Sequence, residues 1–372
     1  MSFRINMASI SLVACILTLS SLFWGRGDED LDDCVCSPFS GDSDGCCTVP
    51  KGGHTKTCHN WFADETCGNG GQGQYCCNSN FESHCCETSA CTAGCRNSVE
   101  GACGCKSQPT RESVGYNESL ALRLLAFNAA SQCDAAAVRA WACTACPADA
   151  RLIDINVTDN EGHSAYVGYD AVTDHIVAVF RGSLSVQDWA KNLDASKTPA
   201  YAELGCASCY VCKGFLDAFK SLQPGVEASI MALLDRYPNR SIALTGHSLG
   251  AAMAAHAAVS LLLVRNLTLT PHVYTFGEPR TGDAAFARWH ASLVPGWLRV
   301  THWNDPVPHL PPQDAGFVHL AREIWYDEAS DDAIVCDGSG EDKDCSLSVA
   351  LAAVFTDHCR YLDHPVCQCV PF

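Results

Sequence analysis

From residue 106 onward, short apolar runs alternate with longer segments in which apolar residues recur at helical spacing. Runs rich in β-branched and aromatic residues predict strands at 175–180, 241–245, 272–276, 298–303 and 317–326. Helical spacing predicts helices at 214–222, 226–237, 251–265 and 284–293. Because strands that alternate with helices form a parallel sheet covered on both faces, the pattern predicts an α/β fold with a mostly parallel central sheet.

The first residues of the chain have a different character. Residues 8–24 are predominantly apolar and follow a short stretch that carries Arg4, so residues 1–27 are predicted to be a secretory signal peptide. Cleavage after Ser21 and cleavage after Gly27 both fit the pattern. An uncleaved signal anchor is the alternative, because this run nearly spans a bilayer. No other stretch is long and apolar enough to cross one, so no integral membrane span is expected in the mature chain.

The cysteines divide the rest of the chain into two parts. Of the 26 cysteines, 14 lie between residues 34 and 105, among Gly, Ser, Asn and Thr with few aliphatic residues. Such a segment cannot build an apolar core and needs cross-links, and it lacks the repeated C-x2-C spacing of metal sites. We therefore expect a small disulfide-stapled module at 28–105 and a globular domain at 106–372. The module's partner is unknown; a binding module, a spacer and a pro-segment all remain open.

The charge balance excludes some partners. With 42 acidic against 24 basic residues, the net charge is −18, which argues against a nucleic-acid partner and against electrostatic anchoring to anionic lipid. Four N-x-S/T sequons are compatible with a secreted, extracellular glycoprotein; they begin at Asn117, Asn156, Asn239 and Asn266.

A candidate nucleophile lies between the predicted strand 241–245 and the predicted helix 251–265. The sequence G-H-S-L-G at 246–250 has the G-x-S-x-G pattern, in which a tight strand-to-helix turn lifts the serine above the carboxyl edge of the sheet. The alternative for a bare G-x-S-x-G is a helix-capping loop. The strand before it and the small residues after it favour Ser248 as a nucleophile.

A serine hydroxyl needs a base to take its proton and an acid to orient that base. In this kind of fold the partners follow in the order Ser, Asp, His. Asp305, just past the strand 298–303, is the favoured acid, with Asp283 and Asp314 as rivals. Four histidines follow Asp305. His309 is expected to be structural and His319 to be a sheet residue, while His358 and His364 are not separated by this reasoning.

At this point the sequence resembles a known family. Residues from about 112 to 372 are similar to the fungal class 3 lipases, the family of the Rhizomucor and Thermomyces lipases. The shared motifs occur in the family's order: V-F-R-G-S at 179–183, K-G-F-L at 213–216, G-H-S-L-G-A at 246–251, T-F-G-E-P-R at 275–280, D-P-V-P-H-L-P-P at 305–312 and D-H-x-x-Y at 357–361. The resemblance implies an α/β-hydrolase fold, with Asp305 as the acid and His358 as the base.

The resemblance also implies an oxyanion hole, which stabilises the charge that develops on the carbonyl oxygen. Its donors would be the backbone N–H of Leu249 and Ser183, through its N–H and its hydroxyl. The following stretch, 184–193, corresponds to the amphipathic lid of related lipases, although it is also compatible with a segment packed permanently on the protein.

The cysteines of the globular domain partly follow the family. The resemblance implies bridges Cys143–Cys146, Cys206–Cys209, and Cys133 to either Cys367 or Cys369. The remaining cysteines depart from the family pattern, and Cys336–Cys345 is expected to be an additional bridge. If the module and this domain are bridged separately, the 11 cysteines of the domain leave one that is free or that pairs outside the chain. The candidates are Cys212, Cys359 and the unpaired member of Cys367 and Cys369.

These observations predict a secreted serine ester hydrolase that works through an acyl-enzyme and needs no metal or organic cofactor. A triacylglycerol lipase that acts on lipid at an interface is the leading expectation. Phospholipase A1 and feruloyl esterase are the alternatives within the family, and an inactive hydrolase-fold binding module is the alternative outside enzymes. Because the chain is acidic, contact with a lipid surface is expected to be apolar.

Overall fold

The fold is known from a computed structural model. It describes residues 114–150, 152–185, 193–270, 272–327, 333–349 and 355–372, together with four short strands between residues 75 and 105. The predicted signal peptide, most of the predicted Cys-rich module and residues 186–192 of the predicted lid lie outside the described residues. The expectation that disulfides hold this module together therefore stays a prediction.

A mixed sheet of eight strands forms the centre of the domain, in the order β14-β13-β12-β11-β10-β7-β6-β5. Five neighbouring strands run parallel, which confirms the predicted fold class. They are β7 (His175–Phe180), β10 (Ile242–His247), β11 (Val273–Phe276), β12 (Trp297–His302) and β13 (Glu323–Tyr326). Antiparallel strands complete both edges: β5 (Leu152–Asn160) and β6 (His163–Asp170) at one, β14 (Ile334–Val335) at the other.

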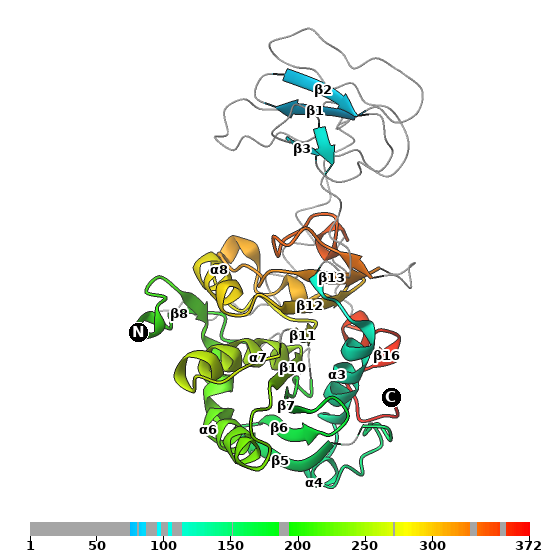
Figure 1. The fold of residues 1–372 in the computed structure, drawn as a ribbon, viewed down its shortest axis with the longest axis vertical. Helices are drawn as coiled ribbons and strands as arrows, with labels where there is room; N and C mark the ends of the chain where they lie inside the picture. Colours follow the sequence, from blue (N-terminus) through cyan, green and yellow to red (C-terminus); the bar gives the residue numbers. More distant parts are fainter. Residues whose placement is uncertain are drawn as a thin grey trace, which may run out of the picture. The chain divides into compact units, whose positions relative to one another are not determined.

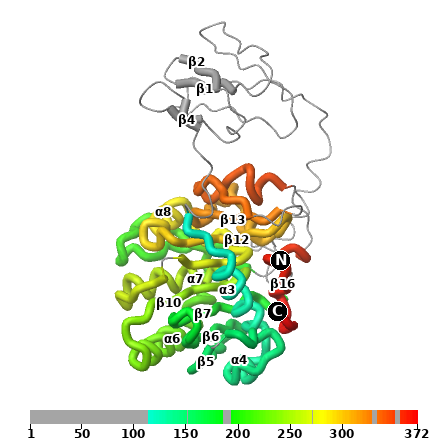
Figure 2. Tube along the Cα trace, turned by 45° about the vertical axis from the view of Figure 1, so that its right-hand side comes forward, coloured from blue at the N-terminus to red at the C-terminus, as the bar shows by residue number. Residues whose placement is uncertain are grey.

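Helices cover both faces of this sheet (Figure 1). The helix α3 (Glu118–Ala130) packs on one face. The helices α6 (Lys213–Arg236), α7 (Leu249–Val259) and α8 (Ala284–Leu293) pack on the other. A view turned by 45° shows the same arrangement, with α3 in front of β10 and β7 (Figure 2). The near-continuous apolar run of β7 follows from this two-sided cover. Ile176 and Phe180 join the core under α6 and α7, while Val177 and Val179 join the core under α3.

The helix α6 corrects the prediction of two separate helices at 214–222 and 226–237. One helix continues through Pro224, although proline cannot donate the backbone hydrogen bond at that position. The side chains of Gln223 and Glu227, on either side of the proline, are joined by a 2.9 Å hydrogen bond. Buried residues on both sides, including Phe219 and Ile230, belong to one core cluster. Packing along the whole helix therefore outweighs the single missing hydrogen bond.

Several boundaries and elements also differ from expectation. The predicted helix 251–265 is α7 followed by a π-helical turn at Ser260–Val264, and the predicted strand 317–326 is shortened to β13. Residue 319 is therefore not a sheet residue. Elements that the apolar pattern did not predict are β5, β6, α3, α4 (Ala135–Arg139), β8 (Lys197–Pro199) and β9 (Tyr210–Cys212).

Short elements connect the main ones. The single-turn helices are η1 (Ala202–Leu204), η3 (Val307–His309), η4 (Gln313–Ala315), η5 (Ser346–Ser348) and η6 (Asp357–Cys359). The strands β15 (Arg360–Tyr361) and β16 (His364–Pro365) form a small hairpin near the C-terminus. Within 75–105, β1 (Tyr75–Ser79) pairs antiparallel with β2 (Glu82–Cys86), and β3 (Cys95–Asn97) pairs antiparallel with β4 (Cys103–Cys105).

The disulfides agree with the predicted bridges and resolve the open choices. The bridges Cys143–Cys146, Cys206–Cys209 and Cys336–Cys345 are present, and Cys133 pairs with Cys369 rather than Cys367. Cys367 pairs instead with Cys359. Among the described residues, Cys212 is the free cysteine, as one of the three candidates. It is buried, and burial raises the pKa of its thiol to about 12, so the thiol stays protonated and unreactive.

No helix in the described part of the chain combines the length and the apolar character needed to cross a membrane.

Candidate active site

Ser248 lies in the sharp turn that joins β10 to α7. Its backbone has φ 58° and ψ −128°, a strained combination for a residue with a side chain. The turn is held by backbone hydrogen bonds from Ser248 N to the Phe276 carbonyl and from Ala251 N to the Ser248 carbonyl, both 2.9 Å. The strand therefore delivers Ser248 to the carboxyl edge of the sheet, above the N-terminus of a buried helix.

The two glycines of the G-x-S-x-G motif are required by close backbone contacts. A Cβ on Gly246 would lie 2.2 Å from the carbonyl carbon of Gly250, and a Cβ on Gly250 would lie 2.0 Å from the Phe180 oxygen. Since real Cβ atoms do not approach other atoms that closely, only glycine fits at either position. The close backbone contacts at Gly246 and Gly250 therefore determine the turn together with the serine.

Asp305 and His358 are brought into direct contact although 53 residues separate them. The two oxygens of the Asp305 carboxylate lie 2.8 and 3.0 Å from His358 Nδ1, and both side chains are buried. The carboxylate also accepts hydrogen bonds from the Tyr361 hydroxyl and from the Val307 backbone N–H, the latter at 2.8 Å. Its orientation is therefore set by three donors, one two residues along the chain and two from the C-terminal segment.

These contacts determine the charge of Asp305. Burial disfavours its ionised form, but the nearby His358 and the hydrogen bonds from His358, Tyr361 and Val307 outweigh that effect and hold the pKa of Asp305 below its usual range. The carboxylate is therefore ionised at neutral pH and is able to stabilise a positive charge on the His358 ring.

His358 also lies next to the turn that carries Ser248. The ring of His247, the residue before Ser248, is centred 4.3 Å from the ring of His358. His247 Nε2 donates to the His358 carbonyl at 2.8 Å. Burial, and then the proximity of His358, lower the pKa of His247 to about 3, so His247 is a neutral donor. Ser248 Oγ and His358 Nε2 are both buried, and neither has a hydrogen-bond partner within the described residues.

The rival residues lie elsewhere or have other partners. Asp283 caps α8 by accepting a hydrogen bond from the Phe286 N–H at 2.9 Å, and Asp314 lies in an exposed single turn. His364 lies in β16 with its ring stacked on Phe372, 4.1 Å between centroids. His319, expected in a sheet, lies in a loop where its Nε2 donates to the Pro308 carbonyl.

The predicted oxyanion-hole residues flank Ser248. Leu249 is the first residue of α7, where a backbone N–H has no acceptor within the helix. Ser183 follows Gly182 in the segment after β7. A Cβ on Gly182 would lie 2.8 Å from the His247 oxygen and 3.3 Å from Ser248 Cβ, so this segment passes directly beside the turn. Leu184, the next residue, is 72% exposed.

Three groups that support the candidate triad were not predicted from the residue patterns. His247, Tyr361 and Gly277 were quoted as parts of motifs without a role. Gly277 has φ 56°, and a Cβ there would lie 2.8 to 2.9 Å from Tyr361, Asp305 and His358. The signal for Gly277 was the glycine itself, directly after β11. The positions of His247 and Tyr361 depend on contacts between distant segments, which local patterns do not encode.

One cluster within the described residues has the spacing of metal ligands, and it does not lie at this site. It consists of Cys336, Asp342 and Cys345. Because the two cysteines are joined in a disulfide, their sulfurs are not available as thiolate ligands.

Comparison with known proteins places this site in a family context. The family model described as Lipase (class 3) matches residues 177–315. The chain is 34% identical over 230 residues to the Lipase of Rhizomucor miehei, covering 59% of this chain and 61% of that protein. It is 36% identical over 166 residues to the Secreted mono- and diacylglycerol lipase 1 of Fusarium solani, covering 45% of this chain and 48% of that protein.

A solved structure is also similar. Its title states that a serine protease triad forms the catalytic centre of a triacylglycerol lipase. It matches with a TM-score of 0.60 and 31% sequence identity over 68% of this chain and 97% of that chain. The chain spans about half to three-fifths of the length of the two curated relatives.

Proposed function

Because this chain belongs to the class 3 lipase family, we propose that it is a secreted serine ester hydrolase, most specifically a triacylglycerol lipase. The contact between His358 and Asp305 beside the buried Ser248 turn is the observation that carries the proposal. In the proposal, Ser248, His358 and Asp305 are the three groups of a Ser-His-Asp triad, and this contact supports the pairing of the last two.

In the proposed mechanism, Ser248 Oγ attacks the ester carbonyl while His358 Nε2 takes its proton. The tetrahedral oxyanion accepts hydrogen bonds from the Leu249 N–H and from Ser183. His358 then gives the proton to the leaving alcohol, and an acyl-enzyme remains on Ser248. A water molecule, deprotonated by His358, attacks the acyl-enzyme and releases the acid. Asp305 orients the imidazole throughout and stabilises its protonated form, and no cofactor takes part.

Two observations favour an acylglycerol over a soluble ester. The named relatives are lipases, one of them a mono- and diacylglycerol lipase and one a triacylglycerol lipase. In addition, Leu184, which directly follows the oxyanion-hole candidate Ser183, is 72% exposed and would contact lipid. Because the chain is acidic, this contact rests on apolar burial and not on charge.

The proposal includes secretion. The sequence features that support it are the N-terminal apolar run and the sequons, and the five disulfides are chemically compatible with an oxidising compartment. All four sequon asparagines, Asn117, Asn156, Asn239 and Asn266, are exposed. Asn117 caps α3 through its Oδ1, which accepts from Leu120 N at 3.0 Å and leaves the amide nitrogen available for a glycan.

The first experiment is a comparison of the secreted protein with Ser248→Ala. We expect Ser248→Ala to abolish hydrolysis of p-nitrophenyl esters while the thermal melting temperature is retained, because the variant removes the nucleophile from a folded site. Undiminished turnover in Ser248→Ala would overturn the assignment.

The second experiment is a substrate panel of triolein emulsion, diolein, phosphatidylcholine, methyl ferulate and short-chain esters. Fastest turnover of triolein supports a triacylglycerol lipase. Turnover confined to diolein, phosphatidylcholine or methyl ferulate would instead assign a mono- and diacylglycerol lipase, a phospholipase A1 or a feruloyl esterase.

A further inference from the structure

The loop that follows Asp305 is held by an unusual number of hydrogen bonds to its carbonyl oxygens. Four consecutive carbonyls, at residues 308–311, accept hydrogen bonds from only two residues. His319 Nε2 donates to the Pro308 carbonyl at 2.6 Å. Arg280 donates to the next three: through NH1 to His309 at 2.7 Å, through its backbone N–H to Leu310 at 2.8 Å, and through NH1 to Pro311 at 3.2 Å.

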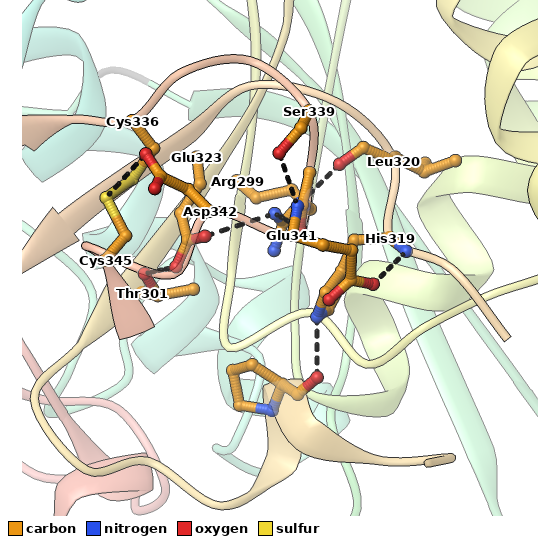
Figure 3. Close-up of polar contacts among 12 residues, drawn as sticks. Arg299, Thr301, His319, Leu320, Glu323, Cys336, Ser339, Glu341, Asp342 and Cys345 are labelled. Atoms are coloured by element: carbon orange, nitrogen blue, oxygen red, sulfur yellow. Dashed lines mark hydrogen bonds and ion pairs between the residues drawn. A yellow bond between two sulfur atoms is a disulfide. The ribbon is translucent and has the colours of Figure 1, made fainter. Parts of the chain in front are cut away.

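Both donors converge on one carboxylate, that of Glu341. Arg280 forms a two-pronged ion pair with it, from Nε to Oε1 at 2.8 Å and from NH2 to Oε2 at 2.9 Å. The His319 backbone N–H donates to Glu341 Oε1 at 2.9 Å. Figure 3 shows the Glu341 carboxylate beside the His319 backbone, with the His319 ring turned away toward a proline carbonyl. The side chains of Arg280 and Glu341 are only 2% and 14% exposed.

Glu341 itself belongs to a loop closed by the Cys336–Cys345 disulfide, outside the region matched by the family model. This loop is attached to the sheet. Arg299, in β12, donates from NH2 to the Gly340 carbonyl at 3.1 Å. Within the loop, the Glu341 N–H donates to Ser339 Oγ at 3.1 Å. The disulfide-closed loop therefore holds the Glu341 carboxylate in a fixed position, where it pairs with Arg280.

The geometry points to Glu341 as a positioning residue for Asp305. We propose that its carboxylate, through Arg280 and His319, fixes the 308–311 loop and thereby the alignment of Asp305 with His358. The argument rests on the proposed function, because it gives Asp305 the role of orienting the base. Two of the three donors to Asp305, His358 and Tyr361, lie in a distant part of the chain, but the Val307 N–H directly precedes the 308–311 loop and is adjacent to Pro308.

The removal of the Glu341 charge has a definite physical consequence. It leaves the buried Arg280 guanidinium without its carboxylate, so the guanidinium turns toward other acceptors or toward water. The carbonyls at 309 and 311 then lose their donor, and the loop that carries Asp305 gains freedom. Because alignment of a catalytic hydrogen bond affects the chemical step more than substrate binding, the loss is expected in kcat and not in KM.

The test is Glu341→Gln, assayed on a soluble ester. We expect kcat to fall at least about tenfold with KM within about twofold of wild type. Glu341→Asp keeps the charge, so its kcat is expected to lie between those of wild type and Glu341→Gln. The matched control is Glu227→Gln. Glu227 is also a buried carboxylate held by both Nε and NH2 of an arginine, Arg265, but it lies on α6, far along the chain from the loop after Asp305. The control is expected to keep the wild-type kcat.

A spectroscopic readout does not depend on turnover. The proton on His358 Nδ1, hydrogen-bonded to Asp305, gives a proton NMR resonance far downfield, identified by its loss in Asp305→Asn. We expect Glu341→Gln to shift or broaden this resonance and Glu227→Gln to leave it in place. If Glu341→Gln does not fold, Arg280→Lys replaces it, since lysine keeps the charge but lacks the two-pronged geometry.

The outcomes separate the two proposals. If wild type and Ser248→Ala hydrolyse every ester tested at the same rate, the proposed function fails. The NMR comparison still tests the positioning role in that case. If wild type is active and Ser248→Ala is not, an unchanged kcat and an unchanged resonance in Glu341→Gln overturn the positioning role alone. An equal loss of kcat in Glu227→Gln would also overturn the positioning role, because the loss would then come from general destabilisation of the fold.

Discussion

At the scale of single residues, the candidate site consists of polar groups that are buried and held by specific donors. Asp305 is ionised in the interior because His358, Tyr361 and the Val307 N–H compensate for its burial. Ser248 occupies a strained backbone conformation, and its hydroxyl has no partner within the described residues. Strain and unpaired polar atoms are costly, so their concentration in one place is typical of a functional site.

The two histidines near the C-terminus provide a sharp test at this scale. We expect His358→Ala to lower kcat as much as Ser248→Ala, since groups that act as a unit lose their effect together. His364→Ala is expected to keep at least half of the activity, because the His364 ring stacks on Phe372 and not on Asp305. Initial rates on p-nitrophenyl butyrate check this, with melting temperatures as the control. An equal loss in both variants would contradict the assignment of the base.

At the scale of elements, the turn between β10 and α7 depends on how closely three segments approach. Gly250 lies against the carbonyl of Phe180 at the end of β7, so the nucleophile turn and the end of the neighbouring strand are one packed unit. The same contact brings the segment with Ser183 beside Ser248. The geometry of the oxyanion hole thus follows from the packing of two adjacent parallel strands.

Replacement of Gly250 by alanine tests this packing. We expect Gly250→Ala to lower the free energy of unfolding by about 3 kcal/mol, because its Cβ would clash with backbone that cannot move aside. Gly162→Ala is the control for a substitution without a clash, since Gly162 has a φ of 81° but no heavy atom within 4 Å of its Cβ position. Its expected cost is about 1 kcal/mol from backbone strain alone. Equal unfolding free energies in urea would contradict the steric explanation.

At the scale of the whole molecule, the interior contains several neutral histidines. The pKa of His247 and that of His256 are both lowered to about 3, mainly by burial and also by the neighbouring His358 and His290, respectively. Burial lowers the pKa of His290 to about 4. In the unfolded chain these rings titrate near 6.5. Between about pH 6.5 and 4 the unfolded state therefore binds more protons, and stability is lost as the pH falls.

The pKa shift of Glu278 has the opposite effect on the pH dependence of stability. Burial raises its pKa to about 7 from 4.5, although Arg299, Thr275 and Trp297 partly counteract burial. The folded state therefore binds the extra proton between about pH 4.5 and 7, and this contribution to stability is lost as the pH rises through that window. The contribution of this one carboxyl to the pH dependence of stability is smaller than the opposing contribution of the three histidines.

The folded domain is accordingly expected to be most stable close to neutral pH and to lose stability in acid. Between pH 6.5 and 4.5, each buried histidine is expected to contribute a slope of about 1.4 kcal/mol per pH unit at most. Urea unfolding at several pH values measures this slope. Glu278→Gln is expected to make it steeper, because the opposing group is removed. A free energy of unfolding that is constant over this range would contradict the linkage.

Much of the architecture was predictable from local patterns. The strand at His175–Phe180 and the helix at Ala284–Leu293 have the predicted bounds, and the Ser248 turn lies where strand and helix signals meet. These features depend on side-chain periodicity and on backbone sterics between near neighbours, which a linear pattern records. Where the chain departs from the predictions, as at Pro224, packing against the sheet outweighs the local preference.

The family motifs added what local patterns could not supply, namely the choice of His358 over His364. That choice agrees with the hydrogen bond to Asp305. Other contacts had no signal in the sequence. Examples are the pairing of Cys359 with Cys367 and the convergence of Arg280 and His319 on Glu341.

The sequence was therefore sufficient for the class of fold and the candidate nucleophile, because both follow from interactions over a few residues. The folded chain was required for the choice of Cys369 over Cys367 as the partner of Cys133. It was also required for the contact of Tyr361 with Asp305 and for the place of Glu341. These contacts form only when the burial of two apolar cores against the sheet brings segments together that are tens of residues apart. Their specificity lies in three-dimensional packing, which no single segment contains.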